Sequence, residues 1–317
     1  MTIGNISTSA QSQLLLTYIQ QDETSLQTTQ TQVATGYIST TYGGIGDQTA
    51  ALTSAQSQSV LANAYASSGQ LAANQVNLQD AQLSELSTLS SQLQQDVTTA
   101  VANGNGTTLM SQVQSVFDQT VQILNSQDAN GNYIYGGGKS NTPPVTPTTL
   151  AQLMALPSGA AAFANGSQKA AVQVGSNQTV QVGVLASDVG SQLMQALQDV
   201  ANFNAGSSGP FGSQLSEAQT TFLTSEIPAA QTANQTVNQI SGSNGEIYQQ
   251  LQAAITQQQS MSSLYKGFAS DIQDVDMATA SSNLSQNQSA LQAALEVTAQ
   301  IGQLSLLNYL GTTSTGG

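Results

Sequence analysis

The side chains with chemistry suited to catalysis are few in this chain and lie far apart. Cysteine, histidine, tryptophan and arginine are absent, so thiol nucleophiles, zinc sites of the Cys/His type and Ser-His-Asp triads are excluded. Two carboxylates alone can hydrolyse a glycosidic bond, but the only acids between residues 136 and 209 are Asp188 and Asp199. These two are eleven residues apart and at or in one expected helix. We therefore expect no enzyme activity, no catalytic residue, no cofactor and no metal site.

Two short motifs that could bind or carry a ligand have simpler explanations. Three glycines precede Lys139, but no Walker-type spacing surrounds that lysine, so a hinge is the better interpretation. Asn-X-Ser/Thr triplets begin at Asn105, Asn165 and Asn177 and could accept glycans. A chain so rich in Asn, Ser and Thr contains such triplets by chance.

Charge excludes two classes of partner. The net charge is -14 with three basic residues, Lys139, Lys169 and Lys266. So few cations cannot neutralise a phosphate backbone and offer no basic face to anionic lipid, so we expect neither nucleic acid nor membrane as a partner. We also expect no small-molecule substrate, because the chain lacks the side chains of a catalytic site. The first sixteen residues lack a basic region, and their apolar run, Leu14 to Leu16, is too short for a signal peptide or a membrane span. A surface made mostly of uncharged amide and hydroxyl side chains, without cysteine, is nevertheless more typical of proteins outside the cell.

Helical periodicity is strongest at the two ends of the chain, over residues 7–36 and 271–310. In the first stretch a thin apolar seam has a spacing typical of a coiled coil. Two parallel apolar rows make the second stretch wider, and one thin seam cannot cover both. We therefore expect the terminal helices to complete their packing on other subunits. The residues predicted to pack between subunits are Leu15, Ile19, Leu26, Val33, Leu284, Leu291, Leu295, Val297, Ile301, Leu304, Leu307 and Leu310.

Between these ends the pattern changes from helical to mixed and back. Apolar spacing predicts helices over 49–102, 107–126 and 189–203, a β-hairpin over 171–184, and helices over 213–280 that break at Pro228 and around 241–245. The expected fold is mainly α with a small β-containing inserted domain. Its three parts are a terminal coiled-coil polymerisation domain (1–45 and 275–317), a helical bundle (46–132 and 213–274) and an inserted α+β outer domain (133–212).

The C-terminal residues resemble a known family. Asp271-Ile-Gln-Asp-Val-Asp-Met-Ala278, with the ending Ser305-Leu-Leu-Asn-Tyr-Leu310, is similar to the C-terminus of the bacterial flagellin superfamily. The ending is most like the branch that forms the hook–filament junction. Residues 132–144 and the hairpin followed by 187–190 resemble the same branch, and residues 30–36 resemble the N-terminal flagellin segment. One departure is the loop 37–46, which has no arginine where the family has a charged, arginine-containing loop.

The resemblance implies a flagellin-like fold and a structural role. It implies a subunit of the bacterial flagellum that joins hook to filament by self-assembly through its terminal helices. The expected partners are copies of itself, a neighbouring hook-associated protein, flagellin subunits and an export chaperone. Family members leave the cell through the flagellar type III channel without a cleaved signal, which implies an extracellular location. A filament flagellin is the alternative, and a secreted surface adhesin or fibre module is the second alternative.

Overall fold

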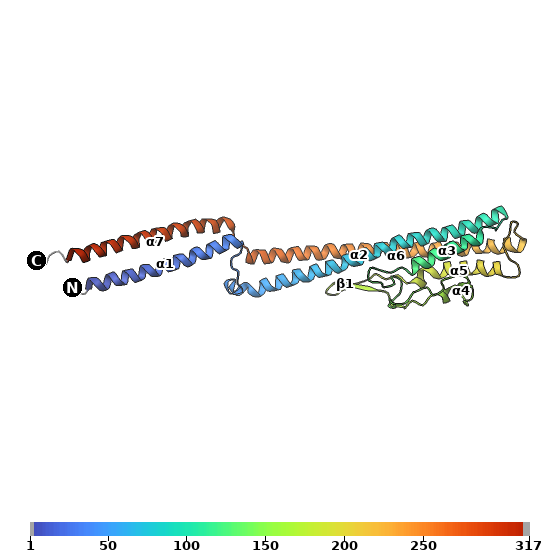
Figure 1. The fold of residues 1–317 in the computed structure, drawn as a ribbon, viewed down its shortest axis with the longest axis horizontal. Helices are drawn as coiled ribbons and strands as arrows, with labels where there is room; N and C mark the ends of the chain where they lie inside the picture. Colours follow the sequence, from blue (N-terminus) through green and yellow to red (C-terminus); the bar gives the residue numbers. More distant parts are fainter. Residues whose placement is uncertain (1–2, 313–317) are drawn as a thin grey trace. The chain divides into compact units, whose positions relative to one another are not determined.

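The structure is a computed structural model that describes residues 3–312, with side chains described from residue 10 to residue 303. The chain divides into two compact units, one made of residues 1–60 and 262–317 and the other of residues 61–261. Two long helices, α2 (Thr49–Asn103) and α6 (Glu217–Gln273), contribute to both units (Figure 1). The three-part domain division expected above stays a prediction.

The first unit contains the terminal helices α1 (Ile3–Thr35) and α7 (Met277–Thr312). They lie side by side and run in opposite directions (Figure 1). Two short 3-10 turns, η1 (Tyr42–Gly44) and η2 (Gly46–Gln48), lead from α1 into α2. The C-terminal helix begins at Met277 rather than at residue 271 as expected, because residues 274–276 leave the helix between α6 and α7.

The long helix α6 differs from the prediction, because it continues through both expected breaks. Pro228 lies inside the helix, and Leu223 before it and Ala230 and Ala233 after it are buried, so both sides of the proline pack against the core. At the Ser-Gly-Ser-Asn-Gly stretch, the buried Asn244 donates from Nδ2 to the carbonyl of Val76 on α2 at 2.9 Å. Tertiary contacts therefore outweigh the local preference of proline and glycine to break a helix.

The second unit is built on residues 61–103 of α2 and on the first part of α6, residues 217–261. Against these lie α3 (Leu109–Leu124) and α5 (Ala186–Ala205), with two elements that the periodicity did not predict, α4 (Leu150–Met154) and η3 (Gly159–Ala162). One continuous apolar core joins these helices. The expected helices over 49–102, 107–126 and 189–203 are present as α2, α3 and α5 with slightly different ends.

The expected hairpin is present and packs on the bundle. Strands β1 (Ala171–Gly175) and β2 (Gln178–Gln181) pair antiparallel, with Val172 opposite Val180. Val174, Val180 and Val182 form a second, smaller core with residues of α2 and α6. The fold is thus mainly α with one two-stranded sheet among the described residues, as predicted.

Residue Tyr135 ties the start of the insert to the bundle. Its side chain is fully buried, and its hydroxyl donates to Gln82 Oε1 on α2 at 2.9 Å. Gln82 Nε2 in turn donates to Ser126 at 2.9 Å. Burial raises the pKa of Tyr135 far above its usual range, so the phenol stays protonated and keeps donating. The Tyr-Ile-Tyr segment therefore acts as an anchor.

Candidate assembly surface

The terminal helices meet along a seam with alternating three- and four-residue steps. On α1 the half-buried and buried positions run through Leu15, Ile19, Asp22, Leu26, Thr29 and Val33. On α7 they run through Ala280, Leu284, Asn287, Leu291, Ala294, Thr298 and Ile301. This spacing is that of a heptad seam, which keeps one stripe of each helix against its partner.

The residues predicted to pack between subunits separate into two groups. Seven of them lie in the seam of this chain's own helix pair: Leu15, Ile19, Leu26, Val33, Leu284, Leu291 and Ile301. Leu295 and Val297 instead remain exposed, at 49% and 46%. Leu304, Leu307 and Leu310 lie outside the described side chains. A role of any of these residues between subunits stays a prediction.

One layer of the seam contains a hydrogen bond between polar side chains of the two helices. Thr29 is buried, and its Oγ1 accepts a hydrogen bond of 2.9 Å from Asn287 Nδ2 on α7. The same hydroxyl donates to the Ser25 carbonyl one turn earlier at 2.5 Å. A polar layer of this kind costs stability but selects one register and orientation. The apolar pattern did not reveal it, because Thr and Asn are common throughout the chain.

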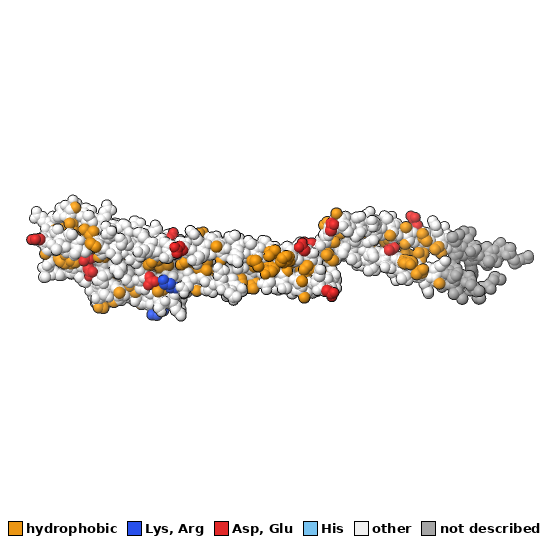
Figure 2. All heavy atoms as spheres, turned by 180° about the vertical axis from the view of Figure 1, so that it is seen from behind, with side chains coloured by type: hydrophobic (Ala, Val, Ile, Leu, Met, Phe, Trp, Pro, Cys, Tyr) orange, Lys and Arg blue, Asp and Glu red, His pale blue; other side chains and the backbone are white. Residues whose placement is uncertain are grey.

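Both flanks of the α1/α7 pair carry exposed apolar side chains. Figure 2 shows apolar side chains on one face of this helix pair. At 100° per residue, Leu14 and Tyr18 share one flank of α1, and antiparallel pairing brings Val297 of α7 to that same flank. Leu16 and Leu295 share the opposite flank by the same geometry. Each of these five side chains is about half exposed. Sequence analysis missed Leu14, Leu16 and Tyr18, although the four-residue spacing of Leu14 and Tyr18 is a detectable signal.

A main-chain clasp holds the two connections of the first unit together. Tyr37 and Asp274 form an antiparallel bridge, in which Ile38 N–H donates to the Gln273 carbonyl at 2.8 Å and Val275 N–H to the Gly36 carbonyl at 2.9 Å. Ser270 Oγ also bonds to the Asp274 carboxylate. The clasp therefore joins the end of α1 to the end of α6.

Asp276 caps the start of α7. Its carboxylate accepts hydrogen bonds from the Thr279 hydroxyl and the Ala278 N–H, both at 2.9 Å. The bond from the Thr279 hydroxyl, followed by main-chain bonds from Ala278 and Thr279, lowers the pKa of Asp276. This gives the Asp274-Val-Asp-Met277 block a physical role, because one aspartate lies in the clasp and the next begins the terminal helix.

The two acids considered for catalysis do not converge. Both lie on α5, where eleven residues correspond to about 16 Å along the axis. That is beyond the separations used in glycoside hydrolysis. Asp188 pairs with Lys169 at 3.0 Å, and Asp199 accepts from Gln195 at 2.8 Å. Within the described part of the chain, no three acidic side chains gather as a metal site would require.

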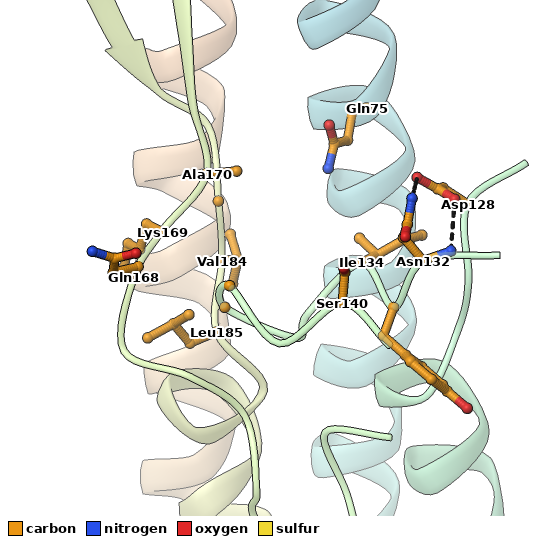
Figure 3. Close-up of a pocket in the computed structure, with 14 residues that line it drawn as sticks. Gln75, Asp128, Asn132, Ile134, Ser140, Gln168, Lys169, Ala170, Val184 and Leu185 are labelled. Atoms are coloured by element: carbon orange, nitrogen blue, oxygen red, sulfur yellow. Dashed lines mark hydrogen bonds between the residues drawn. The ribbon is translucent and has the colours of Figure 1, made fainter. Parts of the chain in front are cut away.

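A cavity of about 370 Å³ lies between α2 and the insert, lined by Gln75, Asn132, Ser140 and the expected glycine hinge (Figure 3). Its acid, Asp128, is used within its own turn, accepting from the N–H groups of Asn130 and Asn132 at 2.8 and 2.9 Å. The glycines form a closely packed turn rather than a free hinge. A Cβ at Gly137, whose φ is +57°, would lie 2.4 Å from the Gly166 carbonyl oxygen.

A comparison with known protein families finds similarity in the C-terminal part of the chain. Residues 227–310 match the family model of the bacterial flagellin C-terminal helical region. No curated protein is similar enough in sequence to match the chain. None of the described helices is long and apolar enough to cross a membrane.

Solved structures show the fold. A chain assigned as a flagellar hook-associated protein from Vibrio parahaemolyticus superposes with a TM-score of 0.60 at 15% identity, over 71% of this chain and 97% of that one. FlgL from Bacillus cereus superposes with a TM-score of 0.52 at 10% identity, over 69% of this chain and 98% of that one. The predicted resemblance to flagellins is therefore confirmed, and the fold is that of a flagellin-like hook-associated protein.

Proposed function

We propose that this chain is a structural subunit of the bacterial flagellum that joins the hook to the filament, in the manner of hook-associated protein 3. It assembles through its terminal helices with copies of itself, and its neighbours are another hook-associated protein and flagellin. It reaches this place by export without a cleaved signal, guided by a chaperone. A filament flagellin is the second candidate, favoured by the flagellin C-terminal match over 227–310.

The observation that carries this proposal is the apolar character of both flanks of the α1/α7 pair. A simple two-fold dimer would cover one flank and leave the other in water. Covering Leu14, Tyr18 and Val297 as well as Leu16 and Leu295 requires at least two neighbours. A helix pair with neighbours on both sides is what a ring or tube of subunits provides.

The energies involved suit assembly rather than folding of a single chain. Completing the burial of a half-exposed Leu, Val or Tyr yields about 1 kcal/mol, since full burial yields about 1.5 to 3 kcal/mol. Five such residues per subunit give a contact of several kcal/mol before the cost of association is subtracted. Such a contact is weak for two isolated copies and strong when each copy touches several others.

Deletion of the gene tests the proposal and separates its two candidates. A strain without the junction subunit should build hooks, lack filaments and release unpolymerised flagellin into the medium. A strain without one filament subunit should lack only that product from its filaments. Complete filaments of normal composition in the deletion strain would contradict both candidates.

A further inference from the structure

An apolar groove lies along the α2/α6 pair within the first unit. It is lined on α2 by the small side chains of Ala51, Ser54 and Ala55, and on α6 by Tyr265, Phe268, Asp271 and Ile272, around a volume of about 460 Å³. The rings of Tyr265 and Phe268 meet edge to face at 6.4 Å and form one wall. Phe268 and its neighbour Leu264 are each 48% exposed. Small residues opposite aromatic ones leave room for side chains projecting from another helix.

One acid lines this groove, and three others lie near its lining residues in the sequence. Asp271 lines it, and Asp47 lies one turn before Ala51 on the approach to α2. Asp274 and Asp276 follow in the connection to α7. Two copies that paired groove to groove would bring these like charges together, which is unfavourable. The occupant must therefore be apolar and must carry no acidic side chains of its own.

The free end of the α1/α7 pair meets this requirement. Residues 1–21 and 297–317 contain no charged side chain. The flank formed by Leu14, Tyr18 and Val297 presents branched and aromatic side chains on a helical surface. Glu296 precedes Val297 in the sequence but lies about 100° away around α7. The flank itself therefore has no charged side chain that would be repelled by Asp271 of the groove.

We propose that the groove formed by Ala51, Ser54, Tyr265 and Phe268 receives the Leu14–Tyr18–Val297 flank of a second copy of this chain. This inference rests on the proposed function and names the surfaces that meet. Because the two surfaces differ, the contact is heterologous: when two copies bind, the copy that supplied its groove keeps a free flank, and the copy that supplied its flank keeps a free groove. Such a contact extends into a ring or helical array instead of stopping at a dimer.

Cysteine cross-linking tests the contact directly, because the natural chain has no cysteine. One full-length variant carries Ser54→Cys in the groove, and a second, distinguished by an affinity tag, carries Gln11→Cys on the same flank as Leu14. The two are mixed at high concentration and oxidised. The proposal expects a mixed Ser54→Cys/Gln11→Cys product in excess over either self-linked product.

Charged substitutions then show whether that product depends on the groove. In the Ser54→Cys copy, Phe268→Asp places an acid in the groove and should lower the yield of mixed product about tenfold, which corresponds to about 1.4 kcal/mol. The matched control Ser263→Asp lies about 140° away on the same helix and is exposed, so it should leave the yield unchanged.

Each other outcome has a definite meaning. If sedimentation shows that the chain assembles but only Gln11→Cys self-links, the flanks meet each other and the groove assignment is wrong while the proposed function stands. If Ser263→Asp lowers the yield as much as Phe268→Asp, the groove assignment is also wrong. If the chain stays monomeric at every concentration and also fails to assemble on isolated hooks, the groove assignment and the proposed function are both wrong.

Discussion

Asn287 Nδ2 donates a 2.9 Å hydrogen bond to Thr29 Oγ1 across the seam of the terminal helices, 258 residues apart in sequence. The pair forms a hydrogen-bonded polar layer in a seam whose other positions are mostly apolar, with Asp22 and Thr298 as the exceptions. Thr29 is buried, and its hydroxyl also donates to the Ser25 carbonyl, so it is the Asn287 amide that loses a partner when the Thr29 hydroxyl is removed.

Substitutions at this layer should therefore be coupled. Thr29→Val removes the hydroxyl with little change of side-chain shape, so the Asn287 amide loses its hydrogen-bond acceptor. The double variant Thr29→Val with Asn287→Leu removes both polar groups. We expect Thr29→Val alone and Asn287→Leu alone each to accelerate amide hydrogen exchange in α7. The double variant should be destabilised by about 1 kcal/mol less than the sum of the two single effects. Thr29→Ser, which keeps the hydroxyl, serves as the control. Additive effects of the two single changes would show that the bond does not contribute.

Gln79 should be a position where an apolar residue stabilises the protein. Its side chain is fully buried on α2, and neither its amide nitrogen nor its amide oxygen has a protein partner. Gln79→Met has a similar length and should raise the free energy of unfolding by about 1 kcal/mol. The matched control is Gln198→Met, because Gln198 is equally buried but donates to the carbonyls of Leu153 and Leu156. Chemical denaturation should show a higher free energy of unfolding for Gln79→Met and a lower one for Gln198→Met. A loss of stability in Gln79→Met would contradict the prediction.

Glu226 should make the second unit less stable at neutral pH than in mild acid. Burial, followed by the nearby Asp199 carboxylate, raises the pKa of Glu226 from 4.5 to about 6. Since the folded state holds this proton more tightly, the contribution to stability is full below pH 4.5 and is lost as pH rises through 6. Glu226→Gln should stabilise the chain at pH 7 by on the order of 1 kcal/mol after allowance for solvent screening, and little at pH 4. The exposed Glu246→Gln is the control, and equal effects of Glu226→Gln at both pH values would contradict the assignment.

Tyr135→Phe should loosen the insert from the bundle. The variant keeps the buried ring but removes the donor to Gln82, whose Oε1 then lacks its partner. We expect a loss of about 1 to 2 kcal/mol in unfolding free energy, measured by thermal or chemical denaturation. Tyr133→Phe, at a neighbouring half-buried site, should change it by much less. If the two variants are equally stable, the hydroxyl is not an anchor.

Deletion of residues 290–317 should abolish incorporation into the flagellum and motility. The deletion removes Leu291, Ala294, Thr298 and Ile301 from the seam, together with Leu295 and Val297 from the flanks. Unit 2 lies wholly outside the deleted residues, so its core should fold as before, which circular dichroism and limited proteolysis can verify. Normal filaments on cells carrying only the truncated chain would refute assembly through the terminal helices.

Much of the fold could be predicted because the apolar periodicity of this chain is regular. Leu15, Ile19, Leu26 and Val33 were identified by spacing alone, and they lie in a helix seam. The hairpin was recognisable from alternating valines. Pro228 and the 241–245 stretch were misinterpreted because local breaking signals were weighed without the burial and cross-helix bonds that override them.

The candidate surface was less predictable, for a physical reason. Whether Leu295 or Leu291 faces the partner helix depends on rotation of α7 within the pair, and the two expected rows did not determine it. The structure takes Leu284, Leu291, Ala294, Thr298 and Ile301 into the seam and leaves Leu295 and Val297 outside. The groove at Tyr265 and Phe268 needs residues from two helices more than 200 positions apart, so no local pattern could reveal it.

Counting this chain in sheared flagella tests the central claim most directly. Filaments with attached hooks are isolated, and the chain is quantified by mass spectrometry against flagellin and located by immunogold labelling. A junction subunit should be present in a trace amount, confined to the hook end of each filament. Thousands of copies along the shaft, or no copies at all, would contradict the assignment.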